Sequence, residues 1–235
     1  CEALSILNHK VTLILPNTGT GQNYFNFYNI DKKFKILRLK LFKKFPTGIR
    51  YYLFSLIAIF KSFNFNPDLF ITRNYFAAFV LSIFKKKVIL EIHDTLEIEG
   101  RFVKILQKKL NFLNFNEIIK ITVTTKTLKK YFLDNWGVNE KKIQVLHNGT
   151  SLKSRFKFNY NKKIKIGYFG SIYKSRGIEM ILKLCKLNKE NDYIVYGGTK
   201  KEVEKIKSSF FGKNLIINSH VPFKEISNKI NEIDV

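Results

Sequence analysis

Short apolar segments alternate along this chain with longer amphipathic ones. Apolar runs rich in β-branched residues and bounded by proline, glycine or polar residues predict buried strands, and apolar residues three and four positions apart predict helices. We expect strands at 9–16, 34–42, 67–73, 88–94, 117–124, 143–149, from 164, and at 193–198 and 215–218. We expect helices at 47–63, 75–84, 102–115, 126–135, from 178 past 184, and at 202–208.

This regular alternation of strands and helices predicts parallel sheets wrapped by helices, which is an α/β fold. A polar, basic stretch without periodicity interrupts the alternation at residues 153–163. We interpret it as a linker between one domain at 1–152 and a second at 164–235. The chain stops at Asp234-Val235, where a new strand is expected to begin.

The composition is typical of a globular protein, with 45% hydrophobic and 15% aromatic residues. The two cysteines, Cys1 and Cys185, form no disulfide framework, so a reduced, cytosolic setting is expected. The four histidines show no zinc-binding spacing, and no metal site is predicted. The longest apolar run, Tyr51–Phe60, is too short to span a bilayer, so we expect a soluble or membrane-surface protein.

The net charge of +24 is unusual for a chain of 235 residues. Such a surface attracts anions, whether nucleic acid, acidic lipid headgroups or sugar nucleotides. The alternative is compositional: a coding sequence rich in A and T spreads lysine over every face. Basic residues recur along the whole chain instead of forming one tail, which weakens the case for a nucleic-acid-binding arm.

The stretch 164–184 carries the strongest chemical signal. Gly167, Gly170 and Gly177 lie where an apolar run passes through a basic loop into an amphipathic segment. Glycines allow the backbone to approach a ligand closely, and the start of the following helix attracts anions, with Arg176 placed to clamp a phosphate. The alternative is a glycine-rich turn with a solvated arginine. The spacing is not the G-x-G-x-x-G of dinucleotide-binding proteins.

Polar residues also follow the other predicted strands. Ligands of open α/β sheets bind beyond the carboxyl ends of the strands, so residues at these ends are candidates for function. They are Arg73, His93, Asp94, Thr124, Thr125, Asn148, Gly149, Gly170, Ser171, Gly197 and Gly198. Glu91 shares a face with His93 and is expected to be structural or an ion-pair partner, whereas Glu97, Glu99 and Arg101 look like charges of an exposed loop.

An ordered set of motifs resembles the retaining glycosyltransferases of family 4. In the first domain they are Pro67-Asp-Leu-Phe-Ile, Glu91-Ile-His-Asp, Ile121-Thr-Val-Thr-Thr-Lys-Thr and the signature Ile143-Gln-Val-Leu-His-Asn-Gly. In the second domain, Ile166-Gly-Tyr-Phe-Gly-Ser-Ile-Tyr-Lys-Ser-Arg-Gly-Ile matches the family's glycine loop. The resemblance extends over nearly the whole chain.

The resemblance implies a GT-B fold with two Rossmann-like, doubly wound parallel-sheet domains. Residues 1–152 would form the N-terminal acceptor domain without its first strand, and 164–235 the first half of the donor domain, which would be incomplete. The family's Glu-x7-Glu element would follow Val235. A fragment truncated at both ends is expected to be inactive alone.

The resemblance also implies roles for individual residues. Donor phosphate binding would fall to Gly170, Ser171, Lys174, Arg176 and Gly177, nucleotide binding to Gly197 and Gly198, and catalysis to His93 and Asp94. Ser171 stands where many members have an arginine, so one expected cation is missing unless Lys174 supplies it. An ordinary left-handed turn is the alternative at Gly197 and Gly198. No metal or cofactor is implied besides the nucleotide-diphosphate sugar itself.

The implied reaction is transfer of a hexose-type sugar from a nucleotide-diphosphate donor, with retention, to a cell-surface glycan or lipid-linked acceptor. A GT-B nucleotide-sugar epimerase and a non-catalytic, basic nucleic-acid-binding protein are the alternatives; we expect no nucleic-acid partner. The expected location is cytoplasmic, with peripheral contact to the inner face of an anionic membrane. Residues 34–45 suggest that contact, although a half-buried strand is the favoured interpretation of this segment.

Overall fold

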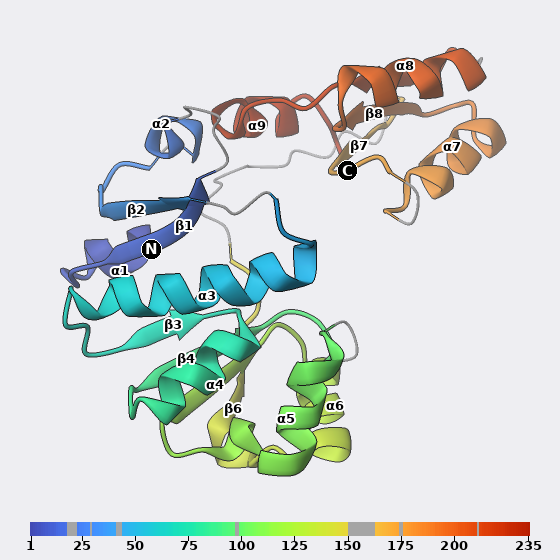
Figure 1. Ribbon diagram of the computed structural model, residues 1–235. Helices are drawn as coiled ribbons and strands as arrows, with labels where there is room; N and C mark the ends of the chain where they lie inside the picture. The colour runs from blue at the N-terminus through green and yellow to red at the C-terminus, as the bar shows by residue number, and fades with distance from the viewer. Residues whose placement is uncertain are drawn as a thin grey trace. The chain divides into compact units, whose positions relative to one another are not determined.

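The computed structural model describes residues 1–17, 23–28, 30–40, 44–96, 99–149, 163–173, 176–210 and 212–235. The chain divides into two compact units, shown in Figure 1. Unit 1 comprises Cys1 and residues 3–20 and 34–150, and unit 2 comprises Glu2 and residues 21–33 and 151–235. Each unit is described separately below.

Unit 1 contains two sheets of parallel strands. The first pairs β1 (Thr12–Asn17) with β2 (Lys35–Lys40). The second has the order β3-β4-β5-β6, formed by β3 (Phe70–Thr72), β4 (Val88–Ile92), β5 (Ile118–Val123) and β6 (Ile143–Val145). Every pairing is parallel, which confirms the α/β class predicted from the alternation of elements.

Unit 1 contains five described helices and two 3-10 turns. The helices are α1 (Glu2–Ile6), α3 (Thr47–Phe63), α4 (Tyr75–Ile83), α5 (Arg101–Leu110) and α6 (Lys126–Trp136), and the turns are η2 (Phe112–Asn114) and η3 (Glu140–Lys142). Two helices begin at side-chain caps: the Asn74 side chain accepts a hydrogen bond from the Ala77 amide, and that of Thr125 from the Leu128 amide.

One hydrophobic core joins the second sheet of unit 1 to its helices. Leu90 and Ile121 of the central strands are fully buried, as are Phe112 beside α5 and Phe132 on α6. The alternating burial of β4 and β5 places apolar side chains inside while leaving the residues that follow each strand outside the core. The core therefore fixes the strand ends that carry the polar candidates.

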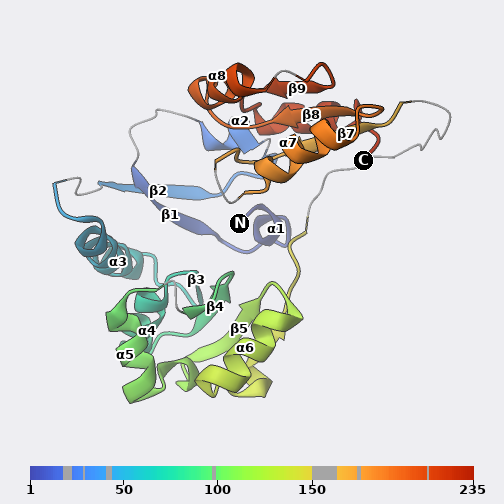
Figure 2. The same cartoon turned by 90° about the vertical axis from the view of Figure 1, so that its right-hand side faces the viewer.

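Unit 2 contains a three-stranded parallel sheet of order β7-β8-β9, visible in Figures 1 and 2. Its elements are β7 (Lys165–Phe169), α7 (Ile178–Leu187), β8 (Asp192–Tyr196), α8 (Lys200–Ser209), β9 (Leu215–Asn218) and α9 (Phe223–Ile230). Residues of α7 and α8 share one core with Val195 and Ile217. The short α2 (Tyr24–Tyr28) also belongs to this unit and contacts α9, with Tyr28 and Phe223 rings 6.1 Å apart.

The last residues of the chain lie along the free side of β7. The Gly167 amide donates to the carbonyl oxygen of Val235 over 2.7 Å, and the Asp234 amide donates to that of Lys165 over 2.8 Å. These hydrogen bonds place Asp234 and Val235 beside β7, where a new strand was expected to begin, but the two residues form no regular strand. Among the described residues, the sheet of unit 2 consists of β7, β8 and β9.

Three sequence expectations need correction or refinement. The helix predicted at 102–115 ends at Leu110, because Asn111 adopts a left-handed conformation with φ 50° before the turn η2. The first strand continues through Pro16 to Asn17, because β2 is the one strand that β1 pairs with among the described residues, and an edge strand tolerates proline. Residues 35–40 form strand β2 with Leu39 buried, in line with the half-buried strand favoured for this segment.

The predicted linker lies outside the described residues except for Lys163, so the domain boundary near residue 152 stays a prediction. None of the described helices is both long and apolar enough to cross a membrane.

Candidate functional site

In unit 1, the candidate residues lie at the carboxyl end of β4. His93 follows the last residue of this strand, and its Nε2 lies 2.5 Å from Oε1 of Glu91. The His93 side chain is largely covered, whereas that of Glu91 is partly exposed. The Glu91 carboxylate therefore orients the imidazole through this contact, as expected for a structural or ion-pair partner of His93.

Asp94, the second catalytic candidate, is exposed. Its charge acts on the buried Tyr75 hydroxyl, where it is one of several causes that raise the pKa of this tyrosine above its usual range. The structure thus brings His93 together with Glu91, while Asp94 follows on the outer side of the turn. The catalytic roles of His93 and Asp94 remain predictions.

A second polar group, which the sequence pattern did not reveal, lies at the same edge of unit 1. Tyr75 is only 4% exposed, and its hydroxyl has no hydrogen-bond partner among the described residues, whereas the hydroxyl of Tyr51 lies close to the Glu99 carboxyl. Burial, and then the charge of Glu99, raise the pKa values of both tyrosines above the usual range. Burial raises the pKa of Glu99 as well, against the opposite effect of the Tyr51 hydroxyl.

Glu99 is therefore not simply a charge of an exposed loop, as its sequence context suggested. It is half-buried, and the adjacent Gly100 is so close to Tyr52 that a Cβ at this glycine would lie 3.1 Å from the tyrosine hydroxyl. The pattern of the chain could not show this, because the tyrosines come from α3 and α4, far from Glu99 in sequence.

Other polar residues at the strand ends have structural roles. The Thr125 hydroxyl caps α6, and Nδ1 of His147 lies 2.9 Å from the Thr124 carbonyl oxygen. The His147 contact connects the ends of β5 and β6, and the Thr125 cap fixes the start of the helix that follows β5.

In unit 2, the candidate loop leaves the carboxyl end of β7. Ligands of open α/β sheets bind beyond the carboxyl ends of the strands. Here the backbones of β7 and β8 converge: the Gly170 amide donates to the Tyr196 carbonyl oxygen over 3.1 Å, and a Cβ at Gly197 would lie 1.7 Å from the Gly170 carbonyl oxygen. Only glycine at position 197 permits this approach.

Gly198 combines two constraints. Its φ is 72°, and a Cβ there would come within 2.3 Å of the Ile172 side chain. The left-handed turn weighed as an alternative for this glycine is therefore present. The tight turn also brings residues 170–172 and 197–198 together, so four sequence-predicted positions, Gly170, Ser171, Gly197 and Gly198, converge on one edge.

The helix α7 begins directly after Gly177, which has φ 89° and lies at its N-cap. The first amide groups of a helix lack partners within the helix and carry a partial positive charge. The Met180 amide still donates to the Gly177 carbonyl oxygen, so this glycine is part of the first turn. The positive end of α7 consequently faces the loop that leaves β7.

Two tyrosines absent from the predicted set hold this loop. The Tyr168 hydroxyl lies 2.8 Å from the carbonyl oxygens of both Ser171 and Arg176. The Arg176 Nε donates to the Tyr173 hydroxyl over 2.6 Å, and its guanidinium lies 5.3 Å from the centre of that ring. Arg176 is exposed but oriented, while Lys174 lies outside the described residues.

Within the described ranges, no three His, Cys, Asp or Glu side chains are grouped so that they could hold a metal ion. The expectation of metal-independent chemistry is not tested by this and stays a prediction.

Comparison with known proteins identifies the family. The family model for Glycosyltransferase Family 4 matches residues 1–154. The chain belongs to glycosyltransferase family 4. The resemblance drawn from the sequence motifs is thereby confirmed.

This family 4 chain is also similar to a curated but uncharacterized glycosyltransferase of Methanocaldococcus jannaschii, with 21% identity over 93% of the chain and 63% of the relative. The chain thus spans less than two thirds of the length of this relative.

Solved structures show the fold of this family 4 chain. A glycosyltransferase from Rickettsia africae matches with TM-score 0.64 and 14% identity over 98% of the chain and 64% of its own. Anabaena HepE, in complex with UDP and glucose, matches with a TM-score of 0.59 and 12% identity, and the match covers 96% of this chain and 73% of HepE. The lipopolysaccharide outer core galactosyltransferase WaaB matches with a TM-score of 0.56 and 13% identity, and the match covers 94% of this chain and 71% of WaaB. These are GT-B glycosyltransferases, and the GT-B fold prediction is confirmed.

The approach of Gly197 to Gly170 predicts a large effect of one methyl group. We expect Gly197→Ala to destabilise unit 2 by about 1–3 kcal/mol, because β7 and β8 must separate. Urea unfolding followed by far-UV circular dichroism should show the lower stability of unit 2. Trp136, the sole tryptophan, lies in unit 1, so the urea midpoint measured by its fluorescence should stay unchanged. Gly149→Ala, with open space around its Cβ, is the control; equal stability of the two variants would refute the contact.

Glu99 predicts a pH-dependent stability. A carboxyl whose pKa is raised in the folded state binds its proton more tightly there, so its contribution to stability is lost as the pH rises through the folded-state pKa. Glu99→Gln should therefore be more stable than the parent at pH 7, with a urea midpoint higher by on the order of 0.2 M, and equal to it near pH 4. Trp136 fluorescence measures the midpoint. A variant less stable at pH 7 would show that the carboxylate is favourably paired.

Proposed function

We propose that this protein transfers a sugar, with retention, from a nucleotide-diphosphate sugar to a cell-surface glycan or lipid-linked acceptor. The single observation that carries the proposal is the loop of unit 2, where two strand ends meet at Gly170 and Gly197 and the positive end of α7 follows. Family membership supplies the reaction class, and this loop supplies a place for the departing diphosphate.

The loop suits a diphosphate for physical reasons. The close approach of the backbones at Gly170 and Gly197 fixes the two strand ends, so the loop that would hold an anion begins from a rigid position. The α7 terminus and Arg176 add positive charge where negative charge develops on the leaving group. In the proposal, Gly170, Ser171, Lys174, Arg176 and Gly177 contact the diphosphate.

The nucleotide itself would extend over Gly197 and Gly198. The Gly198 carbonyl oxygen accepts a hydrogen bond from the His220 amide, so the turn after β8 is anchored to the segment after β9. An anchored turn gives a base or ribose a fixed backbone to approach. The HepE structure in complex with UDP and glucose supports UDP and UDP-glucose as the first probes.

Unit 1 would supply His93, with Glu91 as its positioning residue. A histidine held by a carboxylate can accept or donate a proton at its other nitrogen, or donate a hydrogen bond to a sugar hydroxyl. The proposed role is a contact to the transferred sugar, with Asp94 nearby at the same strand end. No metal ion takes part in the proposed reaction.

Arg176 provides the test of the diphosphate site. We expect Arg176→Ala to weaken UDP binding in calorimetric titration about tenfold, because a charge-assisted hydrogen bond to phosphate is lost. Lys183→Ala removes the same charge from the exposed side of α7 and should leave the affinity unchanged.

Three outcomes separate the possibilities. Equal affinity of parent and Arg176→Ala would remove Arg176 from the site, and absence of UDP binding by the parent would contradict the proposed function. Interconversion of the nucleotide sugar without any acceptor would assign the protein to the epimerases instead.

A further inference from the structure

An exposed cluster of phenylalanine rings lies on unit 1, away from the strand ends described above. Phe60 and Phe63 come from the last turns of α3, and Phe84 follows α4. Phe84 packs against both, with ring centres 5.9 Å from Phe60 and 5.5 Å from Phe63. Despite this packing, Phe60 is 54% and Phe84 44% exposed, and the neighbouring Ile83 is 56% exposed.

Lysines surround these rings. Lys61 lies on α3 beside Phe60, and Lys85, Lys86 and Lys87 follow Phe84 without interruption. The Lys86 ammonium lies 5.4 Å from the centre of the Phe63 ring, which is a cation–π distance. Lys85 is 81% exposed, although it pairs with Glu117 at 2.9 Å. We call these residues, Phe60, Lys61, Phe63 and 84–87, the phenylalanine–lysine surface.

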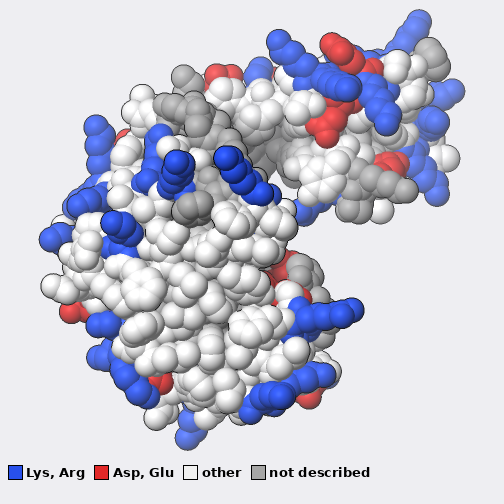
Figure 3. Space-filling view, in the orientation of Figure 1, with Lys and Arg blue, Asp and Glu red and all other residues white. Residues whose placement is uncertain are grey.

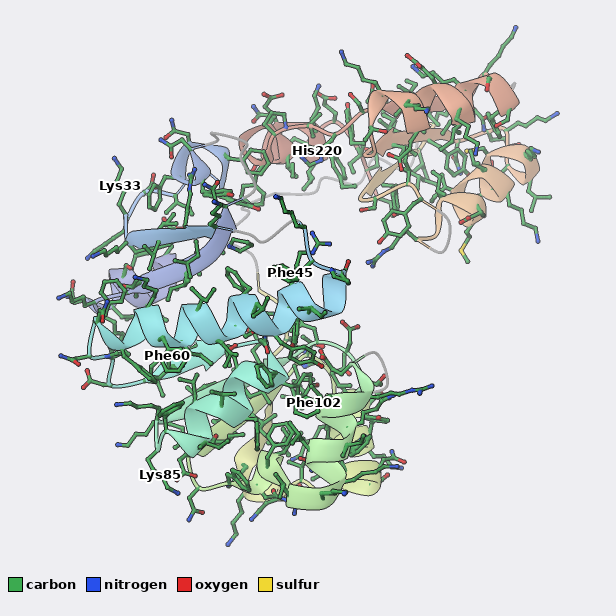
Figure 4. The ribbon with its side chains drawn as sticks, viewed as in Figure 1. Lys33, Phe45, Phe60, Lys85, Phe102 and His220 are labelled. Atoms are coloured by element: carbon green, nitrogen blue, oxygen red, sulfur yellow. The ribbon has the colours of Figure 1, made fainter. Side chains whose placement is uncertain are left out.

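Figures 3 and 4 show this part of unit 1. Figure 4 labels Phe60 and Lys85 on the side toward which α3 ends, while Phe102 is labelled away from them. Figure 3 shows lysine and arginine side chains along the same margin. The positive charge extends to the start of β2, where the Lys35 ammonium lies 4.5 Å from the centre of the Phe65 ring.

The surface lies at the amino ends of the strands. Lys87 directly precedes β4, whereas His93 directly follows it. The surface and the candidate catalytic residues of unit 1 therefore lie at opposite edges of one sheet. No polar candidate of the proposed reaction contributes to the surface, so the proposed function does not explain it.

We propose that the phenylalanine–lysine surface docks on the anionic surface of a lipid bilayer. Exposed aromatic rings gain free energy when they enter the boundary between headgroups and acyl chains, and the flanking lysines attract acidic headgroups. Charge complementarity favours an anionic bilayer as the partner, because four lysines and one glutamate surround an apolar centre. This places the membrane contact on α3 and α4 instead of on residues 34–45.

Two physical features fit this partner. Lysine side chains are long enough to reach phosphates while the rings enter the interface, as snorkelling requires. Helix ends and short loops carry the rings, so insertion requires no unfolding of the core residues beneath them, among which Ile59 and Val88 are buried.

Vesicle co-sedimentation of the 235-residue chain tests the proposal without any nucleotide. Binding should be strong to phosphatidylcholine vesicles containing phosphatidylglycerol and weak to phosphatidylcholine alone. Lys86→Gln with Lys87→Gln should weaken binding about 10- to 30-fold. The matched control, Lys108→Gln with Lys109→Gln on α5, removes the same charge from exposed positions elsewhere and should weaken it much less.

A second pair of variants tests the rings. Phe60→Ser with Phe84→Ser should weaken binding about tenfold or more. Phe102→Ser with Ile105→Ser, 48% and 50% exposed at α5, should bind like the parent. Trp136 fluorescence in urea verifies folding, and the lysine pair decides the question if the phenylalanine pair unfolds.

Several results would overturn the proposal. One is an equal loss of vesicle binding in the two double-lysine variants. Another is binding that does not depend on phosphatidylglycerol, and a third is full binding by a folded Phe60→Ser, Phe84→Ser variant. Self-association of the parent that this variant abolishes would assign the surface to a second copy of the chain. Because no step involves UDP, failure here leaves the donor site untouched, and failure of UDP binding leaves this surface untouched.

Discussion

The contact between the ends of β7 and β8 constrains unit 2 more than any other. The Gly170 carbonyl oxygen occupies the space that a Cβ at Gly197 would need, and the Gly170 amide bonds to Tyr196. This approach fixes where the loop after β7 begins, and the Tyr168 hydroxyl then fixes how it returns to α7 through Ser171 and Arg176. A closed turn, a helix terminus and an oriented guanidinium follow from one backbone contact.

The order of elements and the polar strand ends could be predicted from sequence because burial repeats with the period of each element. Leu90 and Ile92 alternate with partly exposed residues in β4, and the run stops at His93 where the core stops. The same reasoning identified the glycines of unit 2, since turns that bring backbones together require them. In each case the signal is local, and a local pattern is visible in one sequence.

The remaining features depend on residues distant in the chain. Glu99 is half-buried because tyrosines of α3 and α4 reach it, and no pattern around Glu99 reveals them. The helix ends at Asn111 because this residue adopts a left-handed conformation, which asparagine tolerates but does not require. The phenylalanine–lysine surface likewise forms because α3 and α4 end at the same edge, which brings Phe60 to Phe84.

Glycine amide signals offer the most direct test that a nucleotide diphosphate binds where β7 and β8 converge. In a chain labelled with ¹⁵N-glycine and titrated with UDP, we expect the signals of Gly170, Gly177 and Gly197 to shift together in a saturable manner. Those of Gly137 and Gly149 in unit 1 should keep their positions. Saturable shifts confined to other glycines, or no shift at Gly170 and Gly197, would show that the diphosphate does not bind where β7 and β8 converge.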